Sequence, residues 1–268
     1  MEKKFKIGVI GAGYMASSII NGAISSGKVS PQLFLVSDKC QENLDKLSKI
    51  GVSTTTDNSL VANSCEFVLF AIKPQNFNEV LMQIKDCECK KFISIMAGVK
   101  KQTIKNGLGN VKVARCMPNA PCLVKSGAVG IDCSDYNDKN DIDFIKSIFE
   151  GSSAVIDVQE KDLNVVTGIS GSAPAYFYLF AKGLIEAGVK NGLSVDQATS
   201  FVVNTMIGSG KMLLNCKDKT IDELIDSVCS KGGTTIEAIK VYKENQLDQI
   251  SDKAVDACVK RAFELENL

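Results

Sequence analysis

Largely apolar strand-like runs alternate with helical segments over residues 1–158, and this alternation limits the chain to a small set of folds. The runs lie at residues 5–10, 33–36, 67–72, 92–95, 111–114 and 154–157, and helical patterns follow the first two at residues 15–26 and 41–49. Apolar strands separated by helices are typical of a parallel sheet whose two faces are both covered. We therefore expect an α/β domain with a doubly wound, mostly parallel sheet over residues 1–158.

The pattern changes near residue 158, where strand-like runs give way to helical periodicity. Helices are predicted at residues 174–191, 195–215, 221–229, 235–244 and 247–265. They carry more apolar side chains than a thin layer of helices can bury, among them Phe177, Leu179, Phe180, Leu184, Ile185, Phe201, Val202, Met206, Met212 and Leu213. We expect an all-helical domain over residues 159–268 that forms a homodimer, with a higher homo-oligomer left open.

The chain of 268 residues contains no histidine, and its 31 basic residues balance its 31 acidic residues. The missing imidazole excludes Ser-His and Cys-His nucleophile pairs and every histidine metal site. The zero net charge gives no broad positive field of the kind that nucleic acid binding uses. We therefore expect chemistry that uses no imidazole, and no nucleic acid partner.

The ten cysteines form no Cys-x-x-Cys pair, and several lie inside apolar runs, such as Cys65 and Cys258. Tight thiolate pairs would mark a structural zinc site, so no metal is expected and the cysteines are predicted to be reduced in the cytoplasm. The apolar run after Lys6 is too short for a signal peptide. Residues 163–181 carry no charge but include Pro174 and several polar residues, which favours a buried segment over a membrane span.

A glycine-rich turn, Gly11-x-Gly13-x-x-Ala16, directly follows the first predicted strand and opens the first helix. In such a turn the first glycine permits a tight bend, the second lets the backbone approach a pyrophosphate, and the small third residue packs close to the strand. The free N–H groups at the start of the helix favour an anion. The position of this turn in a strand–helix–strand unit predicts a dinucleotide site.

The second predicted strand ends in Val36-Ser37-Asp38-Lys39, where the adenosine ribose of a dinucleotide is expected. Asp38 could accept a hydrogen bond from a free 2′-hydroxyl, which would favour NAD(H). Ser37 and Lys39 could instead bind a 2′-phosphate by a hydrogen bond and a positive charge, which would favour NADP(H). We expect NADP(H) to be preferred and leave NAD(H) as the alternative.

Four further motifs give the chain a specific resemblance. They are Ala71-Ile72-Lys73-Pro74-Gln75, Arg115-Cys116-Met117-Pro118-Asn119-Ala120-Pro121, Ser170-Gly171-Ser172-Ala173-Pro174-Ala175-Tyr176 and Cys229-Ser230-Lys231-Gly232-Gly233-Thr234-Thr235-Ile236-Glu237-Ala238. With the glycine turn, they make the chain resemble the pyrroline-5-carboxylate reductase family over essentially its full length. The resemblance implies a Rossmann domain followed by a helical dimerisation domain. It also implies an oxidoreductase that reduces 1-pyrroline-5-carboxylate to L-proline with NAD(P)H, the last step of proline biosynthesis.

The resemblance also implies which residues line the site. The cofactor side comprises Ile10, Gly11, Ala12, Gly13, Tyr14, Met15, Ser37, Lys39, Asn58, Ala71, Ile72, Lys73, Pro74, Met96, Ala97 and Gly98. The substrate side comprises Ser230, Gly233, Thr234 and Thr235, with Glu160 and Asp218 as weaker candidates. Three positions depart from the family pattern, namely Ala120 (usually Thr), Ala173 (commonly Gly) and Lys231 (commonly Pro). None of the three removes a group that the reaction needs.

Thr235 is the predicted catalytic residue. The glycine pair before it, with Thr234 and Thr235 where the cap of the next helix is expected, presents backbone N–H groups that can bind a carboxylate. We expect the Thr235 hydroxyl to hydrogen-bond the imine nitrogen of the substrate, so that catalysis is mostly orientation. The alternative is that Thr235 only caps the helix.

Two other classes of protein compete with this interpretation. A β-hydroxyacid dehydrogenase shares the two-domain layout, but its catalytic lysine would fall at Phe177, which cannot act as a base. A dinucleotide-sensing protein without activity is the second alternative, and the intact Gly-Gly-Thr-Thr stretch argues against it. Reduction of a different cyclic imine is left open.

Overall fold

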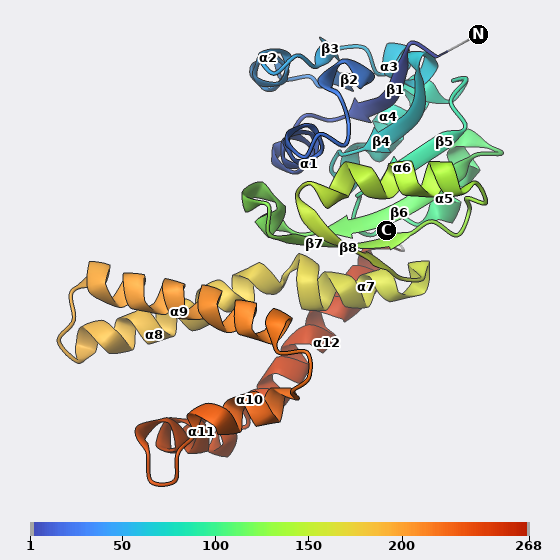
Figure 1. The fold of residues 1–268 in the computed structure, drawn as a ribbon. Coiled ribbons are helices and arrows are strands. Elements are labelled where there is room, and N and C mark those ends of the chain that lie inside the picture. Colours follow the sequence, from blue (N-terminus) through green and yellow to red (C-terminus); the bar gives the residue numbers. More distant parts are fainter. Residues whose placement is uncertain (1–2, 267–268) are drawn as a thin grey trace. The chain divides into compact units, whose positions relative to one another are not determined.

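The structure is a computed structural model that describes residues 3–266 and places eight strands in one sheet (Figure 1). The strands are β1 (Phe5–Ile10), β2 (Phe34–Ser37), β3 (Ser53–Thr55), β4 (Cys65–Phe70), β5 (Lys91–Ser94), β6 (Lys112–Pro118), β7 (Gly127–Asp132) and β8 (Ser153–Asp157). Their order in the sheet is β3-β2-β1-β4-β5-β6-β7-β8. Neighbouring strands pair in parallel except β6 and β7, which are antiparallel. The predicted doubly wound, mostly parallel sheet is confirmed.

Helices cover both faces of this sheet, because its central strands are apolar on both sides. They are α1 (Tyr14–Ser25), α2 (Gln41–Ser48), α3 (Asn58–Ser64), α4 (Phe77–Ile84), α5 (Lys101–Leu108) and α6 (Lys139–Glu150). Helices α1, α2 and α6 enclose one buried core, which includes Val9 and Phe67. Helices α3, α4 and α5 enclose a second core, in which the rings of Phe70 and Phe92 stack with centroids 5.3 Å apart.

Two of the strands, β3 and β7, were not predicted from the sequence. Strand β3 is a short Ser-Thr-Thr segment at the edge of the sheet and lacks an apolar run. Strand β7 contains Gly127 and Gly130, and glycine lowers the strand signal. A Cβ at Gly127 would lie 2.8 Å from Cys122 Cβ, and one at Gly130 would lie 3.1 Å from Val166 Cγ1. The residues that hide this strand in the sequence are therefore the ones that its packing requires.

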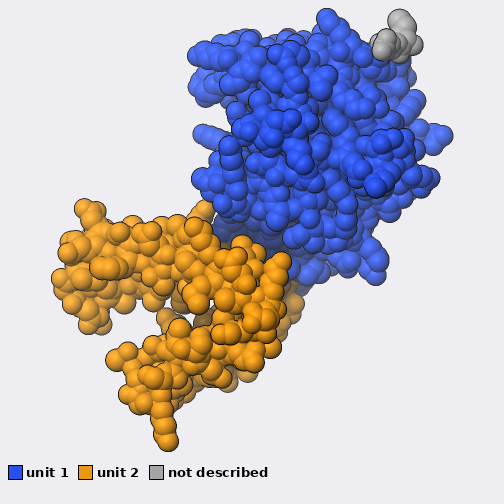
Figure 2. Space-filling model, viewed as in Figure 1, with its two compact units in different colours: residues 1–174, 257–268 blue, residues 175–256 orange. Residues whose placement is uncertain are grey.

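The chain divides into two compact units (Figure 2). The first unit comprises residues 1–174 and 257–268, and the second comprises residues 175–256. The last turns of the final helix therefore belong to the unit that contains the sheet. The domain boundary near residue 158 was drawn from the change in sequence pattern, and it stays a prediction.

The second unit is built from helices. They are α8 (Ala173–Lys190), α9 (Val195–Asn215), α10 (Ile221–Val228), α11 (Thr234–Glu244) and α12 (Leu247–Leu265), of which α8 and α12 extend into the first unit. All five were predicted from periodicity, to within one residue at each end. Reciprocal capping boxes begin α9 (Ser194 with Gln197) and α10 (Thr220 with Glu223). Over the described residues 3–266, no helix is long and apolar enough to cross a membrane.

Candidate active site

The glycine turn joins β1 to α1, and its geometry requires glycine at the first position. Gly11 has a φ of +101°, and a Cβ there would lie 2.5 Å from the carbonyl oxygen of Ala71. The Gly11 N–H donates to the Ser37 carbonyl oxygen at 2.8 Å, and the Ala71 N–H donates to the Ile10 carbonyl oxygen at 2.9 Å. The turn is therefore held between the ends of β2 and β4, at the point where the strand order reverses. Ligands of open α/β sheets bind at such points.

The first turn of α1 leaves room for an anion. Gly13 is the N-cap residue, and no side chain caps this end of the helix. A Cβ at Gly13 would meet no atom within 4 Å, so the backbone is open where a pyrophosphate would approach. Ala16, in contrast, is fully buried against the sheet. The open glycine, the uncapped N–H groups and the buried small residue together fit a dinucleotide.

The other segments predicted to contact the cofactor follow neighbouring strands. Residues 71–74 follow β4 and residues 96–98 follow β5, so they lie at the same edge of the sheet as the glycine turn. Tyr14 is 88% exposed, and Lys73 and Pro74 are exposed as well. The Met96 side chain is buried in the core beneath α4 and α5. Met96 is 1% exposed as a whole residue, backbone included, so the structure does not present it to a ligand.

The polar side chains predicted for the adenosine end are linked to one another. Ser37 is buried, and its hydroxyl donates to Oδ1 of Asn58 at 2.6 Å. Asn58, the first residue of α3, donates from Nδ2 to Oε1 of Gln83 on α4 at 2.7 Å. The structure thus brings Ser37 and Asn58 together and adds Gln83 to them, while their predicted role in binding adenosine stays a prediction.

Asp38 and Lys39, in the loop after β2, both have partners. The Asp38 carboxylate accepts hydrogen bonds from the backbone N–H groups of Ala12 at 2.5 Å and Cys40 at 2.7 Å. Asp38 therefore fastens this loop to the glycine turn. The Lys39 ammonium forms an ion pair with Glu79 on α4, with Nζ 2.6 Å from Oε1.

Asn119 joins two motifs that are far apart in the sequence. Its Nδ2 donates to Oγ of Ser170 at 3.1 Å, and its Oδ1 accepts from the Ala128 N–H at 2.9 Å. Ser170 lies in a π-helical turn (Thr167–Gly171) that follows α7 (Leu163–Val166). Turns of this type occur frequently at functional sites. The motifs at residues 115–121 and 170–176 therefore meet at one place in the first unit.

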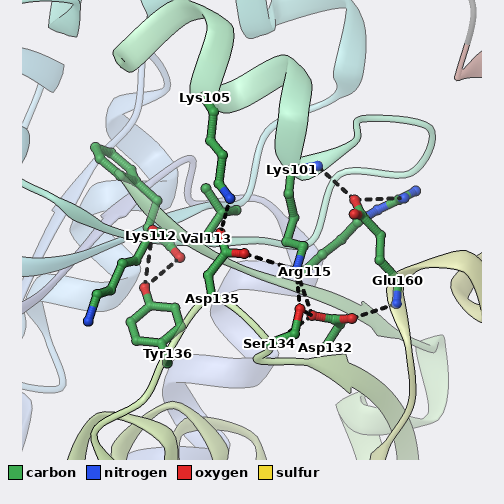
Figure 3. Close-up of polar contacts among 11 residues, drawn as sticks. Lys101, Lys105, Lys112, Val113, Arg115, Asp132, Ser134, Asp135, Tyr136 and Glu160 are labelled. Carbon is green, nitrogen blue, oxygen red and sulfur yellow. Dashed lines mark hydrogen bonds and ion pairs between the residues drawn. The ribbon is translucent and has the colours of Figure 1, made fainter. Parts of the chain in front are cut away.

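A buried cluster of charged residues links α5 to β6 and β7 (Figure 3). Lys101 Nζ lies 2.7 Å from Oδ1 of Asp132 and 3.3 Å from Oδ1 of Asp135. Burial alone would lower the pKa of Lys101, but the hydrogen bond to Asp132 and the charges of both carboxylates outweigh it and raise this pKa. Within residues 3–266, no three His, Cys, Asp or Glu side chains are grouped so as to hold a metal ion.

Arg115 extends this cluster to the end of α12. The Arg115 side chain is 1% exposed, and its Nη1 lies 2.9 Å from Oε1 of Glu266, which is 4% exposed. The Nη1 atom also lies 3.5 Å from Oε1 of Glu160, which accepts a hydrogen bond from the Lys101 backbone N–H at 2.7 Å. Glu160, predicted as a weaker substrate candidate, therefore caps α5. The Nε and Nη2 atoms of Arg115 have no partner among the described residues.

Sequence reasoning missed Glu79, Gln83 and Glu266. An arginine inside an apolar strand is a signal that a buried counter-ion exists, because an unpaired buried charge is costly. The identity of that counter-ion carries no sequence signal, since Glu266 lies far from Arg115 along the chain. Glu79 and Gln83 are spaced i, i+4 and so share one face of α4, but nothing in the sequence shows that this face meets the adenosine end.

The predicted substrate residues lie in the second unit, around the start of α11. Gly233 is the N-cap of α11, Gly232 has a φ of +74°, and the Gly233 N–H donates to the Ser230 carbonyl oxygen at 2.9 Å. The prediction that Thr234 and Thr235 occupy the cap position is wrong, because the tight turn gives that position to Gly233 and the threonines are the first two helical residues. Both threonines are exposed.

No side chain caps the start of α11, so the N–H groups of its first turn are available to an anion. This helix has 11 residues, long enough for its dipole to assist. Asp218 lies in the turn between α9 and α10 and is exposed. The arrangement can bind a carboxylate and place a hydroxyl beside it.

Comparison with known proteins identifies relatives over the whole chain. Residues 160–265 match a family model described as pyrroline-5-carboxylate reductase dimerisation, and residues 6–98 match one described as NADP oxidoreductase, coenzyme F420-dependent. Pyrroline-5-carboxylate reductase 3 of Xenopus laevis is 34% identical over 262 residues, covering 97% of this chain and 95% of that protein. The pyrroline-5-carboxylate reductase of Vibrio alginolyticus is 32% identical over 272 residues, covering 100% of both.

Solved structures give the same result. A pyrroline-5-carboxylate reductase from Coxiella burnetii superposes with a TM-score of 0.91 at 34% identity, covering 98% of this chain and 99% of that chain. The Plasmodium falciparum pyrroline carboxylate reductase with NADP bound has a TM-score of 0.87 at 28% identity, with the same coverage. The chain belongs to the pyrroline-5-carboxylate reductase family, the oxidoreductase family that its motifs predict.

Proposed function

We propose that this chain reduces 1-pyrroline-5-carboxylate to L-proline, with NADPH as the preferred hydride donor. The observation that supports this most directly is the start of α11, where a glycine turn, two exposed threonines and an uncapped helix N-terminus occur within one family motif. Relatives that carry the name of this reductase are similar to the chain over nearly its full length. Proline biosynthesis is the corresponding pathway.

The substrate has a carboxylate and a ring imine, and the chain offers a group for each. The backbone N–H groups at the start of α11 bind the carboxylate, since a helix N-terminus favours negative charge. The Thr235 hydroxyl hydrogen-bonds the ring nitrogen and orients the imine carbon. NADPH supplies a hydride to that carbon when it is bound. The iminium form already carries the proton that the product amine retains, so no imidazole base is needed.

The first unit holds the cofactor in this proposal. The start of α1 with Gly13 takes the pyrophosphate, and residues 71–74 and 96–98 flank the ribose and nicotinamide. Lys39 takes the 2′-phosphate, since the Ser37 hydroxyl is already engaged with Asn58. The Plasmodium falciparum relative was solved with NADP bound, which supports this choice of cofactor.

A homodimer through the helical unit completes the proposal. Residues 160–265 match the dimerisation model of the family, and residues 175–256 leave most of their apolar side chains exposed. Light scattering at micromolar concentration should give twice the chain mass of 28.8 kDa. A monomer with full activity would contradict the dimer. The ten free cysteines support the predicted cytoplasmic location.

The direct test is the loss of reduced-nicotinamide absorbance when 1-pyrroline-5-carboxylate is added to the purified protein, with NADPH and NADH in parallel. Turnover with formation of L-proline, faster with NADPH, is the expected result. A folded protein that binds NADPH without turnover would instead indicate a dinucleotide sensor. Turnover only with another cyclic imine would change the assigned substrate and leave the reaction class, imine reduction, unchanged.

Replacing Thr235 tests its role. Thr235→Val should lower kcat about 10- to 150-fold while the Kd for NADPH changes little, because one hydrogen bond to a charged group contributes about 1.5–3 kcal/mol. Thr103→Val, an exposed helical threonine on α5, is the matched control. Wild-type turnover by Thr235→Val would leave Thr235 as an ordinary residue in the first turn of α11.

A further inference from the structure

Glu79 on α4 holds the ammonium group of Lys39 at 2.6 Å, and we propose that this pair sets the preference of the chain between NADPH and NADH. The inference rests on the proposed function, in which Lys39 meets the 2′ position of the adenosine ribose. With Glu79 present, the preference for NADPH over NADH is weaker than Lys39 alone would give. Glu79 weakens the binding of a 2′-phosphate and leaves a 2′-hydroxyl unaffected.

The arrangement around Lys39 places two acidic groups near one base. Asp38 is next in the chain, and its carboxylate is committed to the N–H groups of Ala12 and Cys40. Glu79 reaches Lys39 from α4, the helix whose Gln83 accepts from Asn58 at the same end of the sheet. The formal charge of Asp38, Lys39 and Glu79 together is therefore negative. A phosphate that carries up to two negative charges meets this environment, whereas a hydroxyl carries no charge into it.

Both side chains of the pair are well exposed, at 74% for Lys39 and 52% for Glu79. Water therefore screens the pair, and a ligand phosphate can compete for the lysine. The Glu79 carboxylate stays on α4 after that exchange, and it repels the phosphate because like charges at close range raise the free energy. Lys39 attracts the 2′-phosphate and Glu79 opposes it, so the chain accepts both cofactors more evenly than one without Glu79.

The test uses nucleotides that carry only the adenosine end. Isothermal titration calorimetry measures the binding of 2′,5′-ADP and of 5′-AMP to the full chain, and the ratio of the two affinities is the readout. The variants are Glu79→Gln, Lys39→Met and the double variant. Glu42→Gln is the matched control, since Glu42 forms an exposed ion pair with Lys46 at 2.7 Å on α2. A second readout is the ratio of kcat/KM with NADPH to that with NADH.

Glu79→Gln should raise the affinity ratio in favour of 2′,5′-ADP by about 1.5- to fivefold, the range of one exposed charge contact. Lys39→Met should lower the ratio, and Glu79→Gln should still raise it in that background, because the repulsion between Glu79 and the phosphate does not need the lysine. Glu42→Gln should leave the ratio unchanged. A ratio that Glu79→Gln leaves unchanged, alone or in the Lys39→Met background, would overturn the inference. Binding of neither nucleotide by the wild type would overturn it together with the proposed cofactor site. Normal ratios without turnover of 1-pyrroline-5-carboxylate would remove only the proposed substrate.

Discussion

The two compact units contain similar kinds of side chains but bury them to different extents. The unit with the sheet encloses two apolar cores and a cluster of charges buried between α5, β6, β7 and the end of α12. In residues 175–256, all of which the structure describes, Ala198 is the one buried residue. Leu179 is 71% exposed and Leu214 is 70% exposed. Burial of apolar surface is the main stabilising term in folding. The sheet unit buries such surface within a single chain, whereas the helical unit leaves most of it exposed.

This difference shows where each unit obtains its stability. The helices of the second unit form because of their propensity, their periodicity and two capping boxes. Their apolar faces are then available to a second copy, as the proposed homodimer requires. Fully burying one such side chain stabilises an assembly by about 1.5–3 kcal/mol. Changes in the first unit should therefore act on folding, and changes in the second should act on assembly.

The largest effect is expected at the Arg115–Glu266 pair. Arg115→Ala removes the nearer cation from a carboxylate that is 4% exposed and leaves it only Lys100, whose Nζ lies 3.4 Å from Oε2. Breaking a buried pair costs about 3–5 kcal/mol of unfolding free energy. Arg261→Ala is the matched control, since Arg261 is 61% exposed and pairs with Glu264 at 2.8 Å. It should change stability by less than about 1 kcal/mol. Urea unfolding of both variants measures this, and equal losses would show that the sheet unit does not depend on its buried charges.

A smaller effect, on assembly, is expected for Leu179→Lys. Losing one buried leucine at an interface should raise the dissociation constant of the dimer about 10- to 150-fold, from about 1.5–3 kcal/mol. Leu60→Lys, at an exposed leucine of α3, should leave assembly unchanged. Analytical ultracentrifugation measures the constant. If Leu179→Lys stayed dimeric while the sheet unit lost stability, the division of roles between the units would be wrong.

Gly13→Ala separates ligand binding from folding within the first unit. The added Cβ meets no protein atom within 4 Å, so the unfolding free energy should stay within about 0.5 kcal/mol of the wild type. The same methyl group would occupy the space of a pyrophosphate, and the Kd for NADPH should rise about tenfold, or about 1.4 kcal/mol. Fluorescence titration with NADPH checks the second value. Unchanged binding would remove the glycine turn from the cofactor site.

The smallest expected effect is a loss of unfolding free energy at acidic pH. Burial raises the pKa of Glu266, but its hydrogen bond with Arg115 and the charge of Arg115 outweigh this and leave the pKa lowered. A carboxyl whose pKa is lower in the folded state stabilises the fold above its unfolded pKa of about 4.3, and this contribution is lost as the pH falls further. The unfolding free energy should therefore decrease as the pH is lowered below about 4.3. The slope should be shallower in Glu266→Gln, and equal slopes from urea titrations would contradict this role.

Much of the fold could be predicted from the sequence, because apolar runs and helical periodicity report burial directly. The exceptions have local causes. Strand β7 depends on Gly127 and Gly130, whose packing partners Cys122 and Val166 are known only after folding. The antiparallel direction of β7 relative to β6 follows from the short connection between them, a 3-10 helix at Ala120–Val124, and this connection could be interpreted only once β7 was known to be a strand.

The site was predicted in part. The glycine turn and the motif at residues 229–238 carry short-range signals, and the structure shows the geometry that those signals require at Gly11. Contacts between segments that are far apart in the sequence have no short-range signal, and examples are the contacts of Glu79 with Lys39 and of Ser170 with Asn119. The N-cap of α11 was assigned one residue late, because threonine is a common cap and the glycine pair does not show which residue ends the turn.

The buried pair of Arg115 and Glu266 also constrains the order in which the chain can fold during its synthesis. The ribosome extends a chain by about 5–20 residues per second, so Glu266 is added about 8–30 s after Arg115. Until then the sheet carries an arginine without its main counter-ion in a place that excludes water. The whole helical unit emerges during this interval, before the first unit can close. All eight strands end by Asp157, yet the sheet unit can complete its packing only after the helical unit has been synthesised.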